Sequence, residues 1–202
     1  MDPFLSISFI MLEGVGQVRP LAGYSEIYMV LPSSAGELEV ETSLLGRRSL
    51  RPGESLGLST GRGIVSRLRG LPAASFLRVQ LNTPRQQELS SPCWFTAESR
   101  HEDESVTLVS PDLSERGVHI ARACVEAEWQ GEEEKNYIVY DPARDAWCAA
   151  SQLSETGWYW FFGGRPLQEP VDPFSSLAMS DRMRNRLVIE CYKKGLLGQL
   201  TG

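Results

Sequence analysis

The chain has 202 residues, which is enough for one ordinary domain or for a core domain with a small appendage. Its 42% hydrophobic and 23% charged residues are close to the globular average and argue against a disordered, coiled-coil or collagen-like protein. The 18 glycines and 12 prolines spread turns along the sequence, and the net charge of −6 argues against a generally basic nucleic-acid coat.

The N-terminal part of the chain is predicted to form strands. Strands are expected at 4–13, 25–31 and 37–42, between turns that contain glycine or proline. Apolar and polar residues alternate at the start of the first segment, which becomes fully apolar from Phe9 to Leu12. In the last of these segments Leu38 and Val40 alternate with glutamates, which predicts one buried and one solvated face. The Arg- and Gly-rich segment 45–72 is expected to be irregular, because it contains several glycines and Pro52.

Further strands are predicted in the second half of the chain, at 76–81, 93–97, 106–109, 137–140, 146–149 and 158–162. The segment 118–129 fits two structures. Its strict alternation favours a strand, whereas Ser110 as an N-cap and Gly131 as a helix end would suit a helix, and a strand is the prediction. Asp141 and Pro142 suit a type I turn between two of the strands, which predicts a hairpin there.

The C-terminal segment, about 180–195, is predicted to be an amphipathic helix capped by Ser180. Met183, Leu187, Val188 and Cys191 share one face, which we expect to be buried. Since no linker or repeat interrupts the sequence, residues 1–202 are expected to form a single domain. The predicted fold class is α+β and β-rich: a mostly antiparallel sheet or sandwich with a C-terminal amphipathic helix.

Metal and cofactor sites are not predicted. The potential metal ligands are widely separated in the sequence: Cys93, Cys124, Cys148, Cys191, His101 and His119. A structural zinc site usually takes its ligands from close pairs, so the cysteines are expected to be small buried side chains. Because no secretory leader or membrane-length apolar segment is present, we expect a cytoplasmic protein with no membrane partner. The strong preference for arginine over lysine is interpreted as a bacterial or phage origin.

Charge is segregated along the sequence. Eight arginines and one acid lie between residues 47 and 85, whereas eleven acids and three arginines lie between 98 and 134. Arginines on a glycine-rich loop suit an anionic partner. The alternative is that the two segments pair with each other. The candidate partner-binding residues are Arg47, Arg48, Arg51, Arg62, Arg67 and Arg69, together with Trp158 and Trp160 of the aromatic strand 158–162.

No catalytic residue is predicted. Residues 57–61 fit the GxSxG pattern of a nucleophile elbow around Ser59, but the elbow needs a strand before the serine and a helix after it. Pro52 and Gly53 precede the serine and further glycines follow it, so neither element is expected.

These observations favour a non-catalytic binding protein, such as a subunit, adaptor or inhibitor, that engages a macromolecule through its charge-segregated surface. Its partner would be another protein or a protein–nucleic acid assembly. One alternative is a nucleic-acid-binding protein that uses the basic stretch 47–85 and the aromatic strand. The other is a serine hydrolase that uses Ser59.

Overall fold

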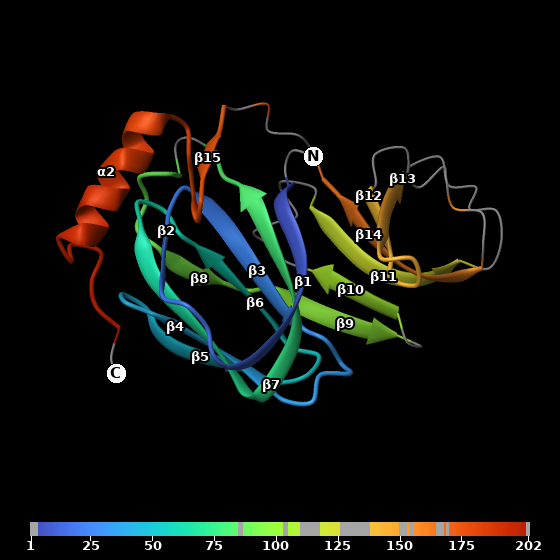
Figure 1. Cartoon of the computed structure of the whole chain (residues 1–202). Helices are drawn as coiled ribbons and strands as arrows, with labels where there is room; N and C mark the ends of the chain where they lie inside the picture. The colour runs from blue at the N-terminus through green and yellow to red at the C-terminus, as the bar shows by residue number, and fades with distance from the viewer. Residues whose placement is uncertain are drawn as a thin grey trace. The chain divides into compact units, whose positions relative to one another are not determined.

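The computed structural model describes residues 4–84, 87–102, 105–109, 118–125, 138–149, 153, 156–164, 168 and 170–200. The chain divides into two compact units (Figure 1). Unit 1 comprises Met1–Thr96 and Pro166–Gly202, and unit 2 comprises Ala97–Arg165. Strands dominate the described residues and a helix lies near the C-terminus, so the β-rich fold class is confirmed. The single domain expected over 1–202 stays a prediction.

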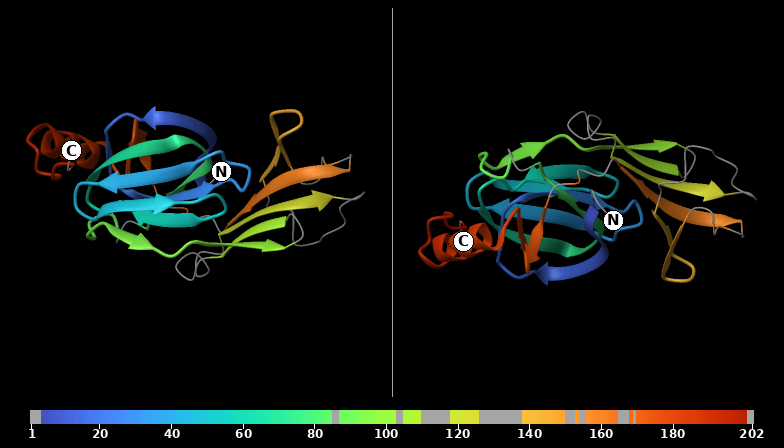
Figure 2. Two further views of the ribbon diagram at one scale, coloured as in Figure 1. Left: turned by 90° about the horizontal axis from the view of Figure 1, so that it is seen from below. Right: turned by 90° about the horizontal axis from the view of Figure 1, so that it is seen from above.

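Unit 1 is built on one antiparallel sheet. Its strands are β1 (Phe4–Val15), β2 (Arg19–Leu21), β3 (Tyr24–Val30), β4 (Glu37–Thr42), β5 (Gly46–Leu50), β6 (Ser55–Ser59), β7 (Ile64–Asn82) and β8 (Cys93–Phe95). The main path runs β5-β4-β7-β3-β6-β8, with β1 and β2 also paired to β7. The first part of the 19-residue β7 pairs with β2 and β4, and its second part pairs with β1 and β3. This long shared strand lets the sheet curl on itself (Figure 2).

The segment 45–72 contains β5, β6 and the start of β7, so the expectation of irregular structure there is wrong. The glycines lie in the turns between the strands: Gly53, Gly61 and Gly63 all have positive φ. Gly70 serves a different purpose, since a Cβ there would lie 1.9 Å from the Leu12 carbonyl oxygen of β1. Glycine therefore permits the turns and the close strand approach that build the sheet.

The core of unit 1 fills the face of the sheet that we call the inner face. Its buried apolar residues alternate along β3, β4, β6 and β7, and they include Tyr28, Leu38, Val40, Leu58 and Phe76. At about 25 cal/mol per Å² of apolar surface removed from water, such a cluster is the main stabilising contribution to the unit. The predicted dry face of β4 is confirmed by the complete burial of Leu38 and Val40.

The outer face of β7 is covered at one end by α2 (Arg182–Lys193) and by the hairpin of β15 (Asp172–Phe174) and β16 (Leu177–Met179). The helix is confirmed, but its cap is Asp181 rather than Ser180. The Asp181 carboxylate accepts a hydrogen bond from the Arg184 backbone N–H. Ser180 instead donates to Glu88, which also pairs with Arg184. These contacts tie the start of the helix to the turn before β8.

The prediction of which helix face is buried is partly wrong. Val188 is 5% exposed and packs in the apolar cluster of the outer face, whereas Met183 and Leu187 are 79% and 64% exposed. The buried side also carries Asn185, whose amide donates to the Asp172 carbonyl. A polar residue at the centre of the buried stripe shifts that stripe away from the face that apolarity alone selects.

We therefore expect Leu187→Ala to change the free energy of unfolding by less than about 0.5 kcal/mol, because the side chain is already in water. Val188→Ala removes two buried methyl groups and is expected to cost roughly 2 kcal/mol. Urea unfolding of both variants measures the difference. A larger loss for Leu187→Ala than for Val188→Ala would contradict this packing of the helix.

Unit 2 is a second antiparallel sheet, ordered β13-β12-β14-β11-β10-β9. Its strands are β9 (Glu98–Glu102), β10 (Ser105–Val109), β11 (His119–Val125), β12 (Ile138–Asp141), β13 (Ala146–Ala149) and β14 (Gly157–Gly163). The strand predicted at 118–129 is confirmed as β11, and 126–129 lie outside the described residues. The hairpin of β12 and β13 is also confirmed, with the Asp141 carboxylate accepting from two backbone N–H groups of the turn.

Among the described residues, no helix combines the length and the apolar composition that crossing a membrane would require.

Candidate functional site

A group of polar side chains interrupts the apolar inner face of unit 1. Alternation along β3 places Tyr24, Glu26 and Tyr28 on this face, and Glu26 is 0% exposed. The strand pairing sets Gln80 of β7 opposite Glu26 and Arg78 opposite Tyr28. A carboxylate is therefore buried within a hydrophobic core, where it requires compensating partners.

Glu26 has partners on three strands: hydrogen-bond donors on β3 and β7, and an arginine on β2. The hydroxyls of Tyr24 and Tyr28 both donate to its carboxylate, the former at 3.3 Å. The Gln80 Nε2 donates to the same carboxylate at 2.8 Å, and the Gln80 Oε1 accepts from the Ser6 hydroxyl at 2.6 Å. Ser6 thus fixes the orientation of the amide. The Arg19 guanidinium adds an opposite charge, with its Nη2 3.9 Å from the Glu26 Oε1.

The two tyrosines are held in their neutral form. Burial raises the pKa of Tyr24 and Tyr28 well above the ordinary value, and the negative charge of Glu26 raises it further. Arg19 lowers the pKa of both tyrosines, and Arg78 that of Tyr24, by smaller amounts. Both phenols consequently stay protonated at neutral pH and remain available as hydrogen-bond donors to Glu26.

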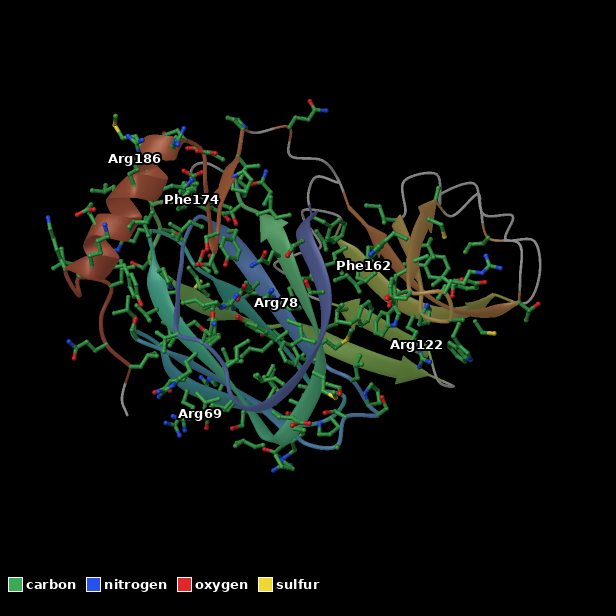
Figure 3. The ribbon with its side chains drawn as sticks, viewed as in Figure 1. Arg69, Arg78, Arg122, Phe162, Phe174 and Arg186 are labelled. Carbon is green, nitrogen blue, oxygen red and sulfur yellow. The ribbon has the colours of Figure 1, made fainter. Side chains whose placement is uncertain are left out.

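Three buried polar atoms of the inner face have no hydrogen-bond partner in the described part of the chain. They are the Arg19 Nη2, the Arg78 Nε and the Ser66 Oγ. Ser66 lies directly opposite Arg19 in the pairing of β2 with β7, and Arg78 lies between β1 and β3 (Figure 3). Unsatisfied buried donors are costly, about 1–3 kcal/mol each, so their presence at one face calls for an explanation.

We call these residues the inner-face cluster: Arg19, Tyr24, Glu26, Tyr28, Ser66, Arg78 and Gln80. Their charges do not cancel. Arg19 and Arg78 are cations and Glu26 is the only anion among these residues. The arrangement therefore has a net positive charge and N–H donors without acceptors in an apolar surrounding. Chemically it can accept a negatively charged or strongly polarised oxygen.

Three of the arginines proposed from the sequence, Arg47, Arg67 and Arg69, form a different group, on the outer face of the same sheet. Their ion pairs among the described residues are made with the glutamates of β4, whereas the internal-pairing alternative named the acidic segment 98–134, much of which lies outside the described residues. The Arg67 Nε lies 2.9 Å from Glu41 Oε2, and the Arg69 Nε lies 3.6 Å from Glu39 Oε1. Arg47 pairs with both glutamates. Glu39 and Glu41 are buried beneath these arginines, so the solvated face predicted for β4 is in fact a covered ion-pair network.

The remaining candidates are spread over the molecule. Arg51 makes a long contact of 3.8 Å to the exposed Glu37, and Arg48 and Arg62 are exposed without an ion pair to any described residue. In unit 2, Trp160 is 5% exposed, and the Arg122 guanidinium lies 4.8 Å from the ring centroid of the half-buried Trp158. The arginines belong to unit 1 and the tryptophans to unit 2, and their role in binding stays a prediction.

Ser59 ends β6, and the chain then turns into β7 at Ile64 without forming a helix. The strand–turn–helix of a nucleophile elbow is absent at this position. The expectation that the cysteines are buried is wrong for Cys93 and Cys124, which are exposed, while Cys148 and Cys191 are half-buried.

No protein-family model matches the chain, and no curated protein matches its sequence. Several solved structures share its fold. Quercetin 2,3-dioxygenase from Acinetobacter baumannii superposes with a TM-score of 0.69 at 13% identity, over 99% of this chain and 88% of that one. GK1651 from Geobacillus kaustophilus gives a TM-score of 0.62 at 20% identity, over 84% and 86% of the two chains. The bacterial pirin YhhW from Escherichia coli, in complex with nickel(II), gives 0.51 at 12% identity, over 81% and 79%.

The chain shares the fold of these proteins, built from curled antiparallel sheets. At these identities the likeness shows the fold and not the activity. It nevertheless contradicts the prediction of a non-catalytic protein that engages a macromolecule, because the proteins that share this fold include an enzyme named for a small molecule. The nucleic-acid-binding alternative, which rested on the basic stretch 47–85 and the aromatic strand, is not supported by these likenesses either. The serine-hydrolase alternative is wrong because no helix follows Ser59.

The inner-face cluster is not among the sites predicted from the sequence. The strand 25–31 was predicted, yet the pattern Tyr-x-Glu-x-Tyr at residues 24–28 sets a carboxylate between two large aromatic residues on one face. A glutamate on the apolar face of a strand is a local conflict of the kind that marks functional sites. Besides the two tyrosines of β3, the partners of Glu26 come from β2 and β7, and no spacing in the sequence indicates that pairing.

Proposed function

We propose that the protein is an enzyme that acts on a small organic molecule, with its site at the inner face of unit 1 around Glu26. The observation that carries this proposal is the buried inner-face cluster. Well-packed apolar side chains are often as stabilising as a buried ion pair or more so, so a charged cluster in a core favours a functional role over a structural one.

The composition of the inner face supports a small-molecule ligand. Ligand sites are predominantly apolar, with a few polar groups that set orientation. Here Tyr28 and Phe76 present neighbouring rings, with centroids 6.4 Å apart, and Trp94 packs against the same cluster. The Arg19, Arg78 and Ser66 donors are the few polar groups. The A. baumannii protein of similar fold is named for quercetin, which is an aromatic molecule rich in hydroxyl and carbonyl oxygens.

A metal ion does not fit the described donor set. The E. coli pirin of similar fold holds nickel(II), but the described residues of this chain contain no group of three or more histidine, cysteine, aspartate or glutamate side chains that could hold a metal. Glu26 is the one carboxylate among the inner-face residues named above, and tyrosine, glutamine and arginine side chains engage it. Both histidines belong to strands of unit 2. We therefore assign no step of the reaction to a metal.

The chemistry available to these residues is electrostatic. Glu26 is the acceptor that holds the Tyr24 and Tyr28 hydroxyls and the Gln80 amide in fixed orientations. The guanidinium groups of Arg19 and Arg78 supply donors that are in place before a substrate arrives. Preorganised donors of this kind stabilise negative charge that develops on a substrate oxygen in the transition state.

Turnover of a panel of small phenols, enols and organic acids, including quercetin, tests this function. We expect the protein to convert at least one compound, and Tyr28→Phe to lower kcat/KM for that compound by roughly tenfold, about 1.4 kcal/mol, because Glu26 loses a donor that fixes it. The exposed Glu37→Gln serves as a control and should leave kcat/KM unchanged. Conversion of none of these compounds, or conversion at the same rate by Tyr28→Phe, would contradict the proposal.

A further inference from the structure

We infer that the inner face of unit 1 recognises a singly charged organic oxyanion, such as a carboxylate, enolate or phenolate, through the guanidinium groups of Arg19 and Arg78. This inference rests on the proposed function and adds the charge and chemical class of the ligand. It is carried by three features of the inner-face cluster: its unbalanced charge, its unsatisfied donors and its apolar surroundings.

The positive charge without a counter-charge in the cluster is that of Arg78. Glu26 is 3.9 Å from Arg19, and three neutral donors complete its shell. Arg78 makes no ion pair with any described residue, although it is only half-exposed at most and projects from the middle of a sheet between β1 and β3. A guanidinium group so placed normally has a carboxylate or phosphate partner. A ligand anion would supply it.

The unsatisfied donors point to an oxygen ligand. The Arg78 Nε and the Arg19 Nη2 are both buried and both lack an acceptor in the described part of the chain. Both guanidinium groups act electrostatically on the same residue, because the positive charge of each lowers the pKa of Tyr24. The Ser66 hydroxyl, opposite Arg19, is 1% exposed and also lacks a partner there. Guanidinium N–H groups and a hydroxyl together match the lone pairs of an anionic oxygen.

The surroundings favour a monoanion with an apolar body. The cluster carries one cation in excess, so a single negative charge balances it, whereas a phosphate dianion would leave an excess negative charge in a core. Phe76 precedes Arg78 on the inner face of β7, and Ile10 of β1 lies opposite Phe76. The inner face is therefore apolar at the position next to Arg78 along β7.

Calorimetric titration with benzoate and with its neutral isostere benzamide tests this inference, with acetate and acetamide as smaller counterparts. We expect each anion to bind at least about tenfold more tightly than its amide, as for a charged hydrogen bond. Arg78→Met should weaken the binding of the anion about tenfold or more and change that of the amide by less than about threefold. Arg186→Met, at an exposed position of α2, is the matched control and should change neither (Figure 3).

A second variant and a chelator guard against a folding defect and a contaminating metal. Arg19→Met should give the same loss for the anion, and EDTA should leave binding to the wild-type protein unchanged. Equal affinity for the anion and the amide would overturn the inference while leaving the proposed function intact, provided that Arg78→Met weakens both. Anion binding that EDTA abolishes, that both arginine variants retain, or that does not occur at all would also overturn it. The turnover measurements on the panel of phenols, enols and organic acids test the proposed function independently of these binding measurements.

Discussion

Replacing Glu26 with alanine is expected to lower the free energy of unfolding of unit 1 by about 3–5 kcal/mol. The carboxylate is 0% exposed, and its removal leaves two tyrosyl hydroxyls and the Gln80 amide without their common acceptor, and the Arg19 cation without its counter-charge. The Gln80 Nε2 keeps the Tyr24 hydroxyl as an acceptor at 3.2 Å, whereas the Tyr28 hydroxyl is left buried and unsatisfied. Urea unfolding followed by circular dichroism measures the loss.

The matched comparison is Glu26→Gln, which keeps the shape of the side chain and one acceptor oxygen. We expect it to cost less than Glu26→Ala, because only the charge and part of the hydrogen bonding are lost. Glu37→Ala removes an exposed carboxylate from a 3.8 Å contact with Arg51 and should change the stability by at most about 1 kcal/mol. A Glu26→Ala variant as stable as Glu37→Ala would show that the inner face rehydrates, and the cluster would then not be a buried network.

Periodicity predicted the local elements well. The alternation of apolar and polar residues in β4 and in β11, and the turn residues Asp141 and Pro142 between β12 and β13, are properties of each segment by itself, and the structure confirms these strands. The prediction of irregular structure over 45–72 is wrong because the glycines of this segment do not break its strands. In the structure Gly61 and Gly63 lie in the turn between two strands, and Gly70 lies within β7 where β1 approaches closely.

The candidate site could not be predicted in the same way, because it depends on which strands become neighbours. Gln80 and Glu26 are 54 residues apart, and Arg19 and Ser66 are paired only through β2 and β7. The same limit explains the misjudged arginines. Their segment is strongly basic in the sequence, but β4 lies between β5 and β7 and supplies the glutamates that neutralise much of it. Net charge along a sequence does not reveal which charges meet across a sheet.

The ion-pair network between the arginines of the outer face and the glutamates of β4 gives a second prediction with a large expected effect on stability. We expect Glu41→Ala to lower the free energy of unfolding by about 3 kcal/mol, near the lower end of the range for a broken buried pair. The Glu41 side chain is 1% exposed and accepts two hydrogen bonds from Arg67, and Arg47 and Arg69 lie within 4.0 Å of it. Because the three arginines keep 17–43% of their side chains in water, they can recover part of their hydration when the carboxylate is lost.

The double substitution Glu41→Ala and Arg67→Ala separates a broken ion pair from lost packing. If the cost of Glu41→Ala comes mainly from the uncompensated cation, removal of Arg67 as well should recover part of the stability, and the double-mutant cycle should give a coupling of about 1–3 kcal/mol. Urea unfolding of the two single variants and the double variant measures it. A coupling near zero would mean that the arginines of the outer face act independently of the β4 glutamates. The basic surface would then be a set of solvated side chains, and the burial of Glu41 would have to be stabilised by the strand pairing of β4 with β5 and β7 alone.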